Sequence, residues 1–362
     1  MHIVFRTDAS KDIGGGHVMR CLTLADLMRR TGAKINFVCR EHTGNMCDLI
    51  ESAGFEVQRL PKQANPPLVT GEPHARWLGA TWEEDAEQTQ SAVRRLAPQV
   101  DWLIVDHYAL DRRWETAGRS IASGLMVIDD LADRLHECDI LLDHNFYPEL
   151  RSRYDLLIPR NCLKLLGPEF ALLRPEFLAA RSELGRRTSR VERILVSFGN
   201  SDLPRATLLA LQLIDAVCES TIQVDIVIGA MCGFIVELQS LCARHPRWTI
   251  HGPNNQMAQL MTRADLAFGG GGVTTWERCC VGLPCLIMAL AINQIAISEA
   301  AQMAKVALYL GESTKIDVNA AAAQLRRLMN EPALVADMSA RGANLVDGRG
   351  AARACAVLTG IS

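Results

Sequence analysis

The feature that most constrains the fold is a regular alternation of short apolar runs with segments of helical pattern. It begins at residue 2 with the run HIVFR, followed by HVMRCLTLADLMRRTG, KINFVCR, NMCDLIESAG and FEVQRL. The short runs are rich in β-branched and aromatic residues, as strands are, and the longer segments repeat apolar residues at helical spacing. Strands that alternate with helices pair in parallel. The sequence therefore predicts an α/β fold built on a parallel sheet.

The alternation occurs twice, which divides the chain of 362 residues into two parts. The second series contains ILVSFGNSD, QVDIVIG, WTIHGP, ADLAFGG and PCLIMAL, which are almost continuously apolar, as strands are when helices cover both faces of a sheet. Residues 179–192, between the two series, are basic and polar and lack an apolar face. We therefore expect a Rossmann-like domain at 1–178, a linker at 179–192 and a second Rossmann-like domain at 193–362, with a ligand cleft between the domains.

The charge balance argues against several classes of partner. Lys and Arg number 38 and Asp and Glu number 41, so the chain offers no general attraction for nucleic acid or an anionic membrane. Arg6 and Asp8 interrupt what would be the apolar part of a signal peptide, and no apolar stretch is long enough to span a bilayer. The 12 cysteines show no Cys-x-x-Cys spacing, which argues against a structural zinc site. We expect a cytoplasmic monomer without metal or cofactor.

A first glycine-rich loop, Ile13-Gly14-Gly15-Gly16, falls between the first predicted strand and the first predicted helix. Backbone N–H groups at such a helix start attract a phosphate or a carboxylate. The loop lacks the dinucleotide-binding fingerprint, because Met19 stands where the third glycine is needed. The alternative is a turn that only requires positive φ.

His17 begins this helix and is the candidate general base. The positive end of a helix disfavours a second positive charge, so we expect a neutral imidazole that can accept a proton. Asp8 and Ser10 lie just upstream and are candidates for orienting the ring. The alternative is a histidine that only hydrogen-bonds at the helix start.

A second glycine-rich segment, ADLAFGGGGVTTWERCCVGLP, combines a strand, four glycines at 269–272, two threonines and Glu277. Strand, glycines and hydroxyl groups in this order favour an anion cradle. The segment lacks the Lys-Ser/Thr pair of a P-loop, which argues against phosphoryl transfer from a nucleoside triphosphate. Glu277 could bind the two vicinal hydroxyl groups of a ribose. Alternatively it only complements the helix dipole.

Polar residues follow several predicted strands. Asp106-His107-Tyr108, Asp129-Asp130 and Asp143-His144-Asn145 each come after an apolar run, and the carboxyl ends of parallel strands line the ligand crevice. At least one Asp of each group is expected to cap the next helix. In the second half, Ser201 and the pair Asn293-Gln294 occupy corresponding places.

A series of motifs extends over nearly the whole chain and ends with Asn293-Gln294: RTDASKDIGGGHVMRCLTLA, WLGATWEEDA, VDHYALD, VIDDLADRLHECDILLDHN, LLGPEFALLRPEF, SFGNSD and GGGGVTTWERCCVGLP. Together they resemble the UDP-2,4-diacetamido-2,4,6-trideoxy-β-L-altropyranose hydrolases of pseudaminic acid biosynthesis. The resemblance implies a glycosyltransferase-B-like fold of two Rossmann-like domains, with the last helix, 351–359, packing back on the first domain. It also implies metal-independent hydrolysis of the UDP-sugar with inversion at the anomeric carbon.

The resemblance further implies a role for each matching residue. His17 would activate water, Tyr108 would border the sugar, and Arg174 would contact the ligand between the domains. Glu277 would bind the ribose. The remaining contacts to diphosphate or sugar would come from Gly14, Gly15, Gly16, Ser201, Gly271, Gly272, Val273, Thr274, Asn293 and Gln294. The chain departs from the family at Asn200, where the usual motif Gly-Gly-Ser-Asp-Pro has a glycine, and the Cβ of Asn disfavours a close backbone contact with the ligand there.

Three other functions fit parts of the sequence. A glycosyltransferase of the same fold would pass the sugar of a UDP-amino sugar donor to an acceptor instead of water. A nucleotide-sugar binding protein without catalysis would keep the second glycine segment but would not need His17. A nicotinamide-dependent oxidoreductase is disfavoured by the failed fingerprint in the first glycine loop.

Overall fold

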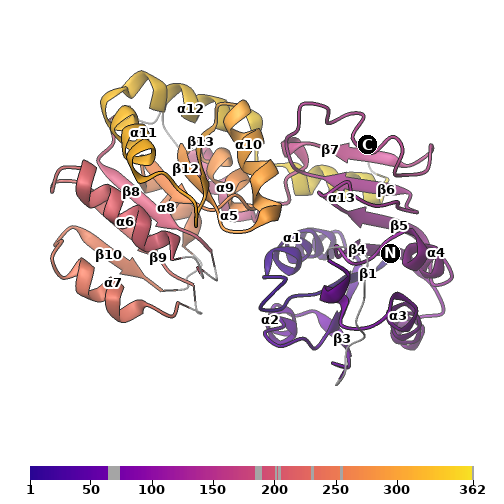
Figure 1. Ribbon diagram of the computed structural model, residues 1–362. Coiled ribbons are helices and arrows are strands. Elements are labelled where there is room, and N and C mark those ends of the chain that lie inside the picture. The colour runs from indigo at the N-terminus through magenta and orange to yellow at the C-terminus, as the bar shows by residue number, and fades with distance from the viewer. Residues whose placement is uncertain are drawn as a thin grey trace. The chain divides into compact units, whose positions relative to one another are not determined.

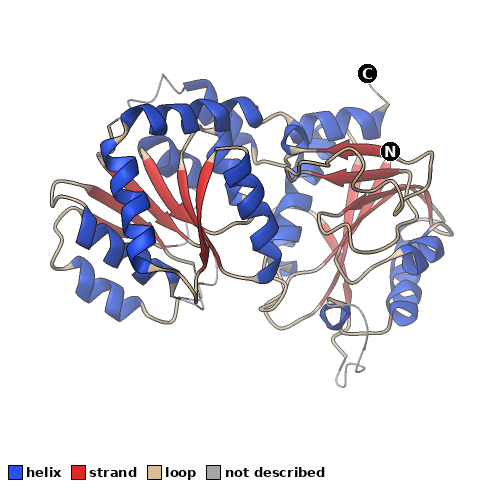
Figure 2. Ribbon diagram, turned by 45° about the horizontal axis from the view of Figure 1, so that its top comes forward, coloured by secondary structure: helices blue, strands red, loops and turns tan. Residues whose placement is uncertain are grey.

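The computed structural model describes residues 1–63, 74–183, 190–199, 202, 205–229, 232–252 and 256–360. Backbone contacts divide the chain into two units. Unit 1 consists of Met1–Asn145, Glu149–Leu172 and Gly350–Ser362, and unit 2 consists of Phe146–Pro148 and Leu173–Arg349. Each unit is a parallel sheet with helices on both faces (Figures 1 and 2).

The sheet of unit 1 has seven parallel strands in the order β3-β2-β1-β4-β5-β6-β7. The strands are β1 His2–Thr7, β2 Lys34–Arg40, β3 Glu56–Leu60, β4 Val100–Asp106, β5 Ala122–Ile128, β6 Ile140–Asp143 and β7 Leu163–Leu166. The helices are α1 Gly16–Arg30, α2 Cys47–Ser52, α3 Trp82–Leu96, α4 Arg112–Gly118 and α13 Gly350–Thr359, with short 3₁₀ turns η1 Ala75–Leu78 and η2 Pro168–Phe170. The chain winds one way from β1 to β3 and the other way from β4, so β1 and β4 flank a switch point, where parallel sheets bind ligands.

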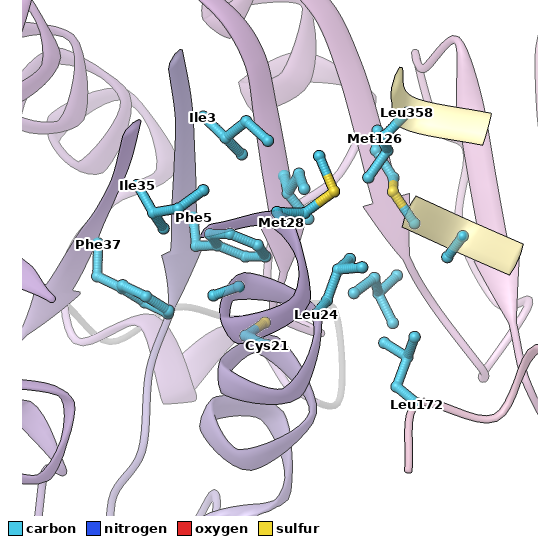
Figure 3. Packing of buried hydrophobic residues seen from close by; sticks show 14 of the residues in the cluster. Ile3, Phe5, Cys21, Leu24, Met28, Ile35, Phe37, Met126, Leu172 and Leu358 are labelled. Atoms are coloured by element: carbon cyan, nitrogen blue, oxygen red, sulfur yellow. The ribbon is translucent and has the colours of Figure 1, made fainter. Parts of the chain in front are cut away.

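The core of unit 1 holds α1 in a fixed position above the sheet. Phe5 of β1 and Phe37 of β2 stack with ring centroids 5.0 Å apart, and Leu24 and Met28 of α1 are buried beside them (Figure 3). Helix α13 belongs to the same core and contributes the buried Leu358. Burial of this apolar face fixes the start of α1, and therefore His17, at the carboxyl end of β1.

The sheet of unit 2 has six parallel strands in the order β10-β9-β8-β11-β12-β13. They are β8 Arg193–Ser197, β9 Gln223–Val227, β10 Trp248–His251, β11 Leu266–Gly269, β12 Cys285–Ala289 and β13 Ala307–Glu312. The helices are α5 Pro175–Glu183, α6 Ala206–Val217, α7 Ile235–Cys242, α8 Met257–Arg263, α9 Thr274–Cys280, α10 Ile295–Met303, α11 Val318–Asn330 and α12 Pro332–Leu345, with the 3₁₀ turn η3 Ile292–Gln294. The strand order reverses at β8 and β11, and the second glycine segment leaves the sheet there.

The predicted fold class of two Rossmann-like α/β domains is confirmed, but the boundary between them lies earlier than the expected linker. Helix α5 packs against α8 and α9, and unit 2 includes Leu173–Arg349. Phe177 is completely buried, and Arg181 donates hydrogen bonds to the carbonyl oxygens of Cys280 (2.8 Å) and Val346 (3.1 Å). A basic residue that looked solvated in the sequence therefore serves as a packing contact. In the part of the chain that the structure describes, no helix has the length and apolarity needed to cross a bilayer.

One buried histidine makes the stability of unit 1 sensitive to alkaline pH. His136 Nδ1 lies 2.7 Å from Glu115 Oε1, and its Nε2 lies 3.8 Å from Asp129 Oδ2. Burial lowers the pKa of His136, but the two carboxylates outweigh burial and raise this pKa to about 9. Such a group stabilises the fold fully below its unfolded pKa of about 6.5, and this contribution is lost as pH rises through the folded pKa.

We therefore predict that the free energy of unfolding falls by about 3 kcal/mol as the pH rises from about 6.5 to about 9. His136→Asn should flatten this decline, which denaturant titrations at several pH values would measure. His2→Asn is the matched control, because His2 is a partly exposed histidine of the same unit. An equally steep decline in His136→Asn would contradict this assignment.

Candidate functional site

His17 is paired with a buried carboxylate at the switch point of unit 1. Its Nδ1 lies 2.6 Å from Oδ1 of Asp106, the last residue of β4, and 3.2 Å from Nη2 of Arg20. The closer group is a carboxylate, which can only accept, so Nδ1 carries the hydrogen and Nε2 carries the lone pair of the ring. No residue in the described ranges forms a hydrogen bond with Nε2. The ring is oriented and its acceptor nitrogen is unbonded.

Arg20 keeps the Asp106 carboxylate ionised. Its Nε donates to Oδ2 and its Nη2 donates to Oδ1, both at 2.6 Å. Burial alone would raise the pKa of Asp106, but Arg20 and His17 together hold this pKa well below its usual range. His17 and Arg20 lie three residues apart on α1 and so share one face of the helix. The sequence interpretation noted Asp106 at a strand end but did not connect it with His17, and it missed Arg20.

The expectation that Asp8 or Ser10 orients His17 is wrong. Asp8 Oδ1 accepts the Arg40 N–H at 2.6 Å and pairs with Arg6 Nη1 at 2.7 Å, in a buried cluster next to the site. Ser10 Oγ accepts the N–H groups of residues 12 and 13 at 3.1 and 3.0 Å. Both residues bond to nearer backbone and side-chain groups, so they shape the loop before α1.

Tyr108 borders the His17 ring and is itself held in place. The two rings meet edge to face, with centroids 4.5 Å apart. The Tyr108 hydroxyl donates to Asp130, whose other carboxylate oxygen accepts from Arg20 Nη1 at 3.1 Å. The Trp77 ring stacks on the Tyr108 ring, with centroids 5.9 Å apart. The ends of β4 and β5 therefore converge on His17, as the sequence predicted for these strand ends.

His144, which follows β6, is a further buried group near this network. Neither ring nitrogen has a hydrogen-bond partner among the described residues. Burial, reinforced by the positive charge of Arg20, lowers the pKa of His144 to about 4. His144 is therefore neutral at physiological pH.

The three glycines at the start of α1 differ in whether their backbone angle or a neighbouring side chain requires a glycine. Gly14 has φ of +78°, and a Cβ on Gly15 would lie 2.8 Å from Met46 Sδ. Gly16 has neither constraint, because a Cβ there would meet nothing within 4 Å. The structure therefore leaves open space at Gly16, beside His17. The approach of a ligand to this loop stays a prediction.

In unit 2 the second glycine segment is braced by Gln294. The Gln294 Oε1 accepts the N–H groups of Gly271 and Leu290, both at 3.1 Å. A Cβ on Gly271 would lie 2.1 Å from Ser298 Oγ, so only glycine allows this close approach to α10. Gln294, which the resemblance implied would contact the ligand, therefore supports the loop through its side-chain oxygen. Asn293 lies exposed in η3.

The segment from Gly272 to Thr274 presents unused donors. In the described part of the chain, no hydrogen bond is formed by the backbone N–H groups of Gly272, Val273 or Thr274. A Cβ on Gly272 would meet no atom within 4 Å. Consecutive free N–H groups in a turn form a concave anion-binding surface.

Glu277 and Arg174, both predicted to contact the ligand, lie together within unit 2. Arg174 Nη2 is 3.4 Å from Glu277 Oε1, and Arg174 Nη1 is 2.8 Å from Glu176 Oε1. Burial raises the pKa of Glu277, and Arg174 opposes this effect. Ser201 and Asn200 lie outside the described residues. Within the described residues, no group of three or more His, Cys, Asp or Glu side chains has the arrangement of a metal site.

Comparison with known proteins finds distant relatives that cover most of this chain. The spore coat polysaccharide biosynthesis protein SpsG of Bacillus subtilis is 28% identical over 99% of this chain and 98% of its own length. The UDP-2,4-diacetamido-2,4,6-trideoxy-β-L-altropyranose hydrolase of Campylobacter jejuni is 25% identical over 73% of this chain and 83% of its own length. No protein-family model matches the chain.

Solved structures with the same fold include glycosyltransferases and a putative UDP-N-acetylglucosamine 2-epimerase from Listeria monocytogenes. The glycotransferase of kitacinnamycin matches with a TM-score of 0.67 and 17% identity, over 99% of this chain and 98% of that one. MurG of Acinetobacter baumannii matches with a TM-score of 0.65 and 15% identity, over 99% of both chains. The fold is therefore the GT-B fold, as the sequence predicted.

The Asp106–Arg20 pair should dominate the stability of this site. Asp106→Ala leaves the buried Arg20 without its main counter-charge, and we predict that it lowers the free energy of unfolding by about 3–5 kcal/mol. Asp26→Ala is the control, since Asp26 pairs with Arg29 and Arg30 on the exposed face of α1 and should cost about 1 kcal/mol or less. Denaturant titration of both variants measures the difference, and equal losses would show that Asp106 is not the buried partner of Arg20.

Proposed function

We propose that this protein hydrolyses a UDP-sugar to UDP and the free sugar. The observation that carries the proposal is the His17–Asp106 pair, in which Nε2 of an oriented imidazole is left unbonded as a proton acceptor. The hydrolase from Campylobacter jejuni supports the choice of reaction and of substrate, UDP-2,4-diacetamido-2,4,6-trideoxy-β-L-altropyranose.

In the proposed reaction the oxygen of water attacks the anomeric carbon and its proton passes to His17 Nε2. The bond between the anomeric carbon and the β-phosphate oxygen breaks, and its electron pair leaves with UDP. The products are UDP and the sugar with inverted anomeric configuration. UDP is a good leaving group, so a single oriented base can supply roughly two to four orders of magnitude in rate. Asp106 stabilises the imidazolium that forms, as the carboxylate of a catalytic triad does.

We assign nucleotide binding to unit 2. The unused N–H groups of Gly272, Val273 and Thr274 can bind the diphosphate and meet the charge that develops on it. Glu277 can accept hydrogen bonds from both hydroxyl groups of the ribose, and Arg174 holds its carboxylate in place. In this scheme the leaving group is stabilised by donors of the chain and no metal ion is needed.

The first test is proton NMR of the purified protein with this UDP-sugar and no acceptor. The wild type should release UDP and the free sugar, with the inverted anomer appearing first. His17→Ala should lower turnover at least about 100-fold, because it removes the group assigned to accept the proton from water, while UDP affinity measured by calorimetry stays unchanged. His2→Ala controls for the loss of a histidine. Weakened UDP binding with normal turnover would refute the role of His17.

The second candidate is a glycosyltransferase that uses a UDP-amino sugar donor, which the fold of the solved structures favours. In that reaction the His17 Nε2 would take the proton of an acceptor hydroxyl instead of water. The same NMR experiment separates the two reactions. Free sugar formed at a steady rate without acceptor supports the hydrolase, and turnover that appears only when acceptor is added supports the transferase.

A further prediction concerns Glu277. The wild type should bind UDP more tightly than 2′,3′-dideoxy-UDP, because the carboxylate accepts from both ribose hydroxyl groups. Glu277→Gln should weaken UDP binding by about tenfold and remove most of this preference, as calorimetry with both nucleotides would measure. Glu299→Gln, at an exposed position on α10, should bind both as the wild type does. A preference that persists in Glu277→Gln would exclude the ribose contact.

A further inference from the structure

Arg278 of α9 lies buried beneath the second glycine segment. It is 3% exposed. Its Nη2 donates to the carbonyl oxygen of Gly270 at 2.8 Å and to Thr275 Oγ1 at 3.1 Å, and its Nη1 donates to Thr274 Oγ1 at 3.3 Å. A Cβ on Gly269 would lie 2.4 Å from Nη1, so the guanidinium occupies the space that a side chain would need there. The loop is built around this cation.

Arg278 forms no ion pair with a carboxylate in the described part of the chain, although the neighbouring Glu277 interacts electrostatically with it. The buried arginines of the described residues are Arg6, Arg20, Arg40, Arg134 and Arg278. The first four each pair with a carboxylate at 2.6–2.7 Å. Arg278 has only neutral acceptors among the described residues, and its Nε has no hydrogen-bond partner there. A buried cation that forms no ion pair is costly, so an anion bound at the glycine segment would be stabilised by Arg278.

Arg278 also determines what the Thr274 hydroxyl can do. Because Thr274 Oγ1 accepts from Arg278 Nη1, its own hydrogen is free to point elsewhere and to be donated. Thr274 is only partly buried, and its backbone N–H is one of the unused donors beside it. A phosphate oxygen that meets these donors would also lie in the field of the guanidinium.

We propose that Arg278 is a positioning residue for the diphosphate of the nucleotide: it supplies a positive charge beneath the glycine segment that forms no ion pair among the described residues, and it turns the Thr274 hydroxyl into a donor. This inference rests on the assignment of nucleotide binding to unit 2. It adds the reason why that segment selects a diphosphate: the affinity of the site depends on phosphate charge through a cation below the loop.

The test measures the dissociation constants of UDP, UMP and uridine for the full chain by calorimetry. Arg278→Met removes the charge and keeps a side chain of similar length. It should weaken UDP binding by about tenfold to a hundredfold, weaken UMP binding less and leave uridine binding unchanged. Arg278→Lys keeps the charge and should restore part of the UDP affinity. Arg326→Met, which removes an exposed arginine of α11, is the matched control and should bind all three compounds as the wild type does.

If Arg278 has only a structural role, Arg278→Met should weaken the binding of uridine and of UDP by the same factor. That result, or UDP affinity unchanged in a folded Arg278→Met, would overturn the inference. If Arg278→Met does not fold, the affinities of Thr274→Val and Arg278→Lys for UDP and uridine provide the test. Each of these variants should bind UDP more weakly than the wild type and bind uridine equally well. A wild type that binds neither UDP nor uridine would instead overturn the assignment of nucleotide binding to unit 2.

Discussion

The ionised carboxylate of Asp106 is the group on which the arrangement around His17 depends. It is completely buried, and it remains charged because Arg20 donates two hydrogen bonds to it. If it were protonated it would no longer require a donor at Nδ1, and the tautomer of His17 would not be fixed. The strand order brings this carboxylate beside α1, because β4 pairs directly with β1. A single neighbour relation in the sheet therefore determines the chemistry available at the start of α1.

Some of this could be predicted from the sequence and some could not. The alternation of strand and helix patterns predicted both sheets, and the glycine segments were located because they follow predicted strands. The partner of His17 was not predicted, since Asp106 lies 89 residues away and becomes a neighbour only through strand order. Asp8 was a candidate for orienting His17, but in the structure it bonds to Arg6 and to the Arg40 backbone. These contacts are also set by tertiary structure and could not be predicted from the sequence.

The same limit applies in unit 2. Composition suggested a solvated linker around Arg181, but whether an arginine faces water or binds two carbonyl oxygens depends on what packs against its helix. Gln294 was a reasonable ligand candidate at a strand end, yet its oxygen braces the loop of Gly271. Residue type and position in the chain indicate where a site lies. They do not distinguish the residues that would touch a ligand from those that support them.

The two units differ in a way that fits the charge movement of the proposed hydrolysis. In unit 1 the buried arginines Arg6, Arg20 and Arg40 are paired with carboxylates. The Asp106 carboxylate beside His17 would stabilise a positive charge on the His17 ring. In unit 2 the cation beneath the glycine segment, Arg278, forms no ion pair with a carboxylate among the described residues. As the bond to the leaving group breaks, positive charge grows on the base and negative charge grows on the diphosphate. Under the proposed function, groups already in place in each unit would stabilise the sign of charge assigned to it, and such preorganisation lowers a barrier because nothing has to reorganise during the reaction.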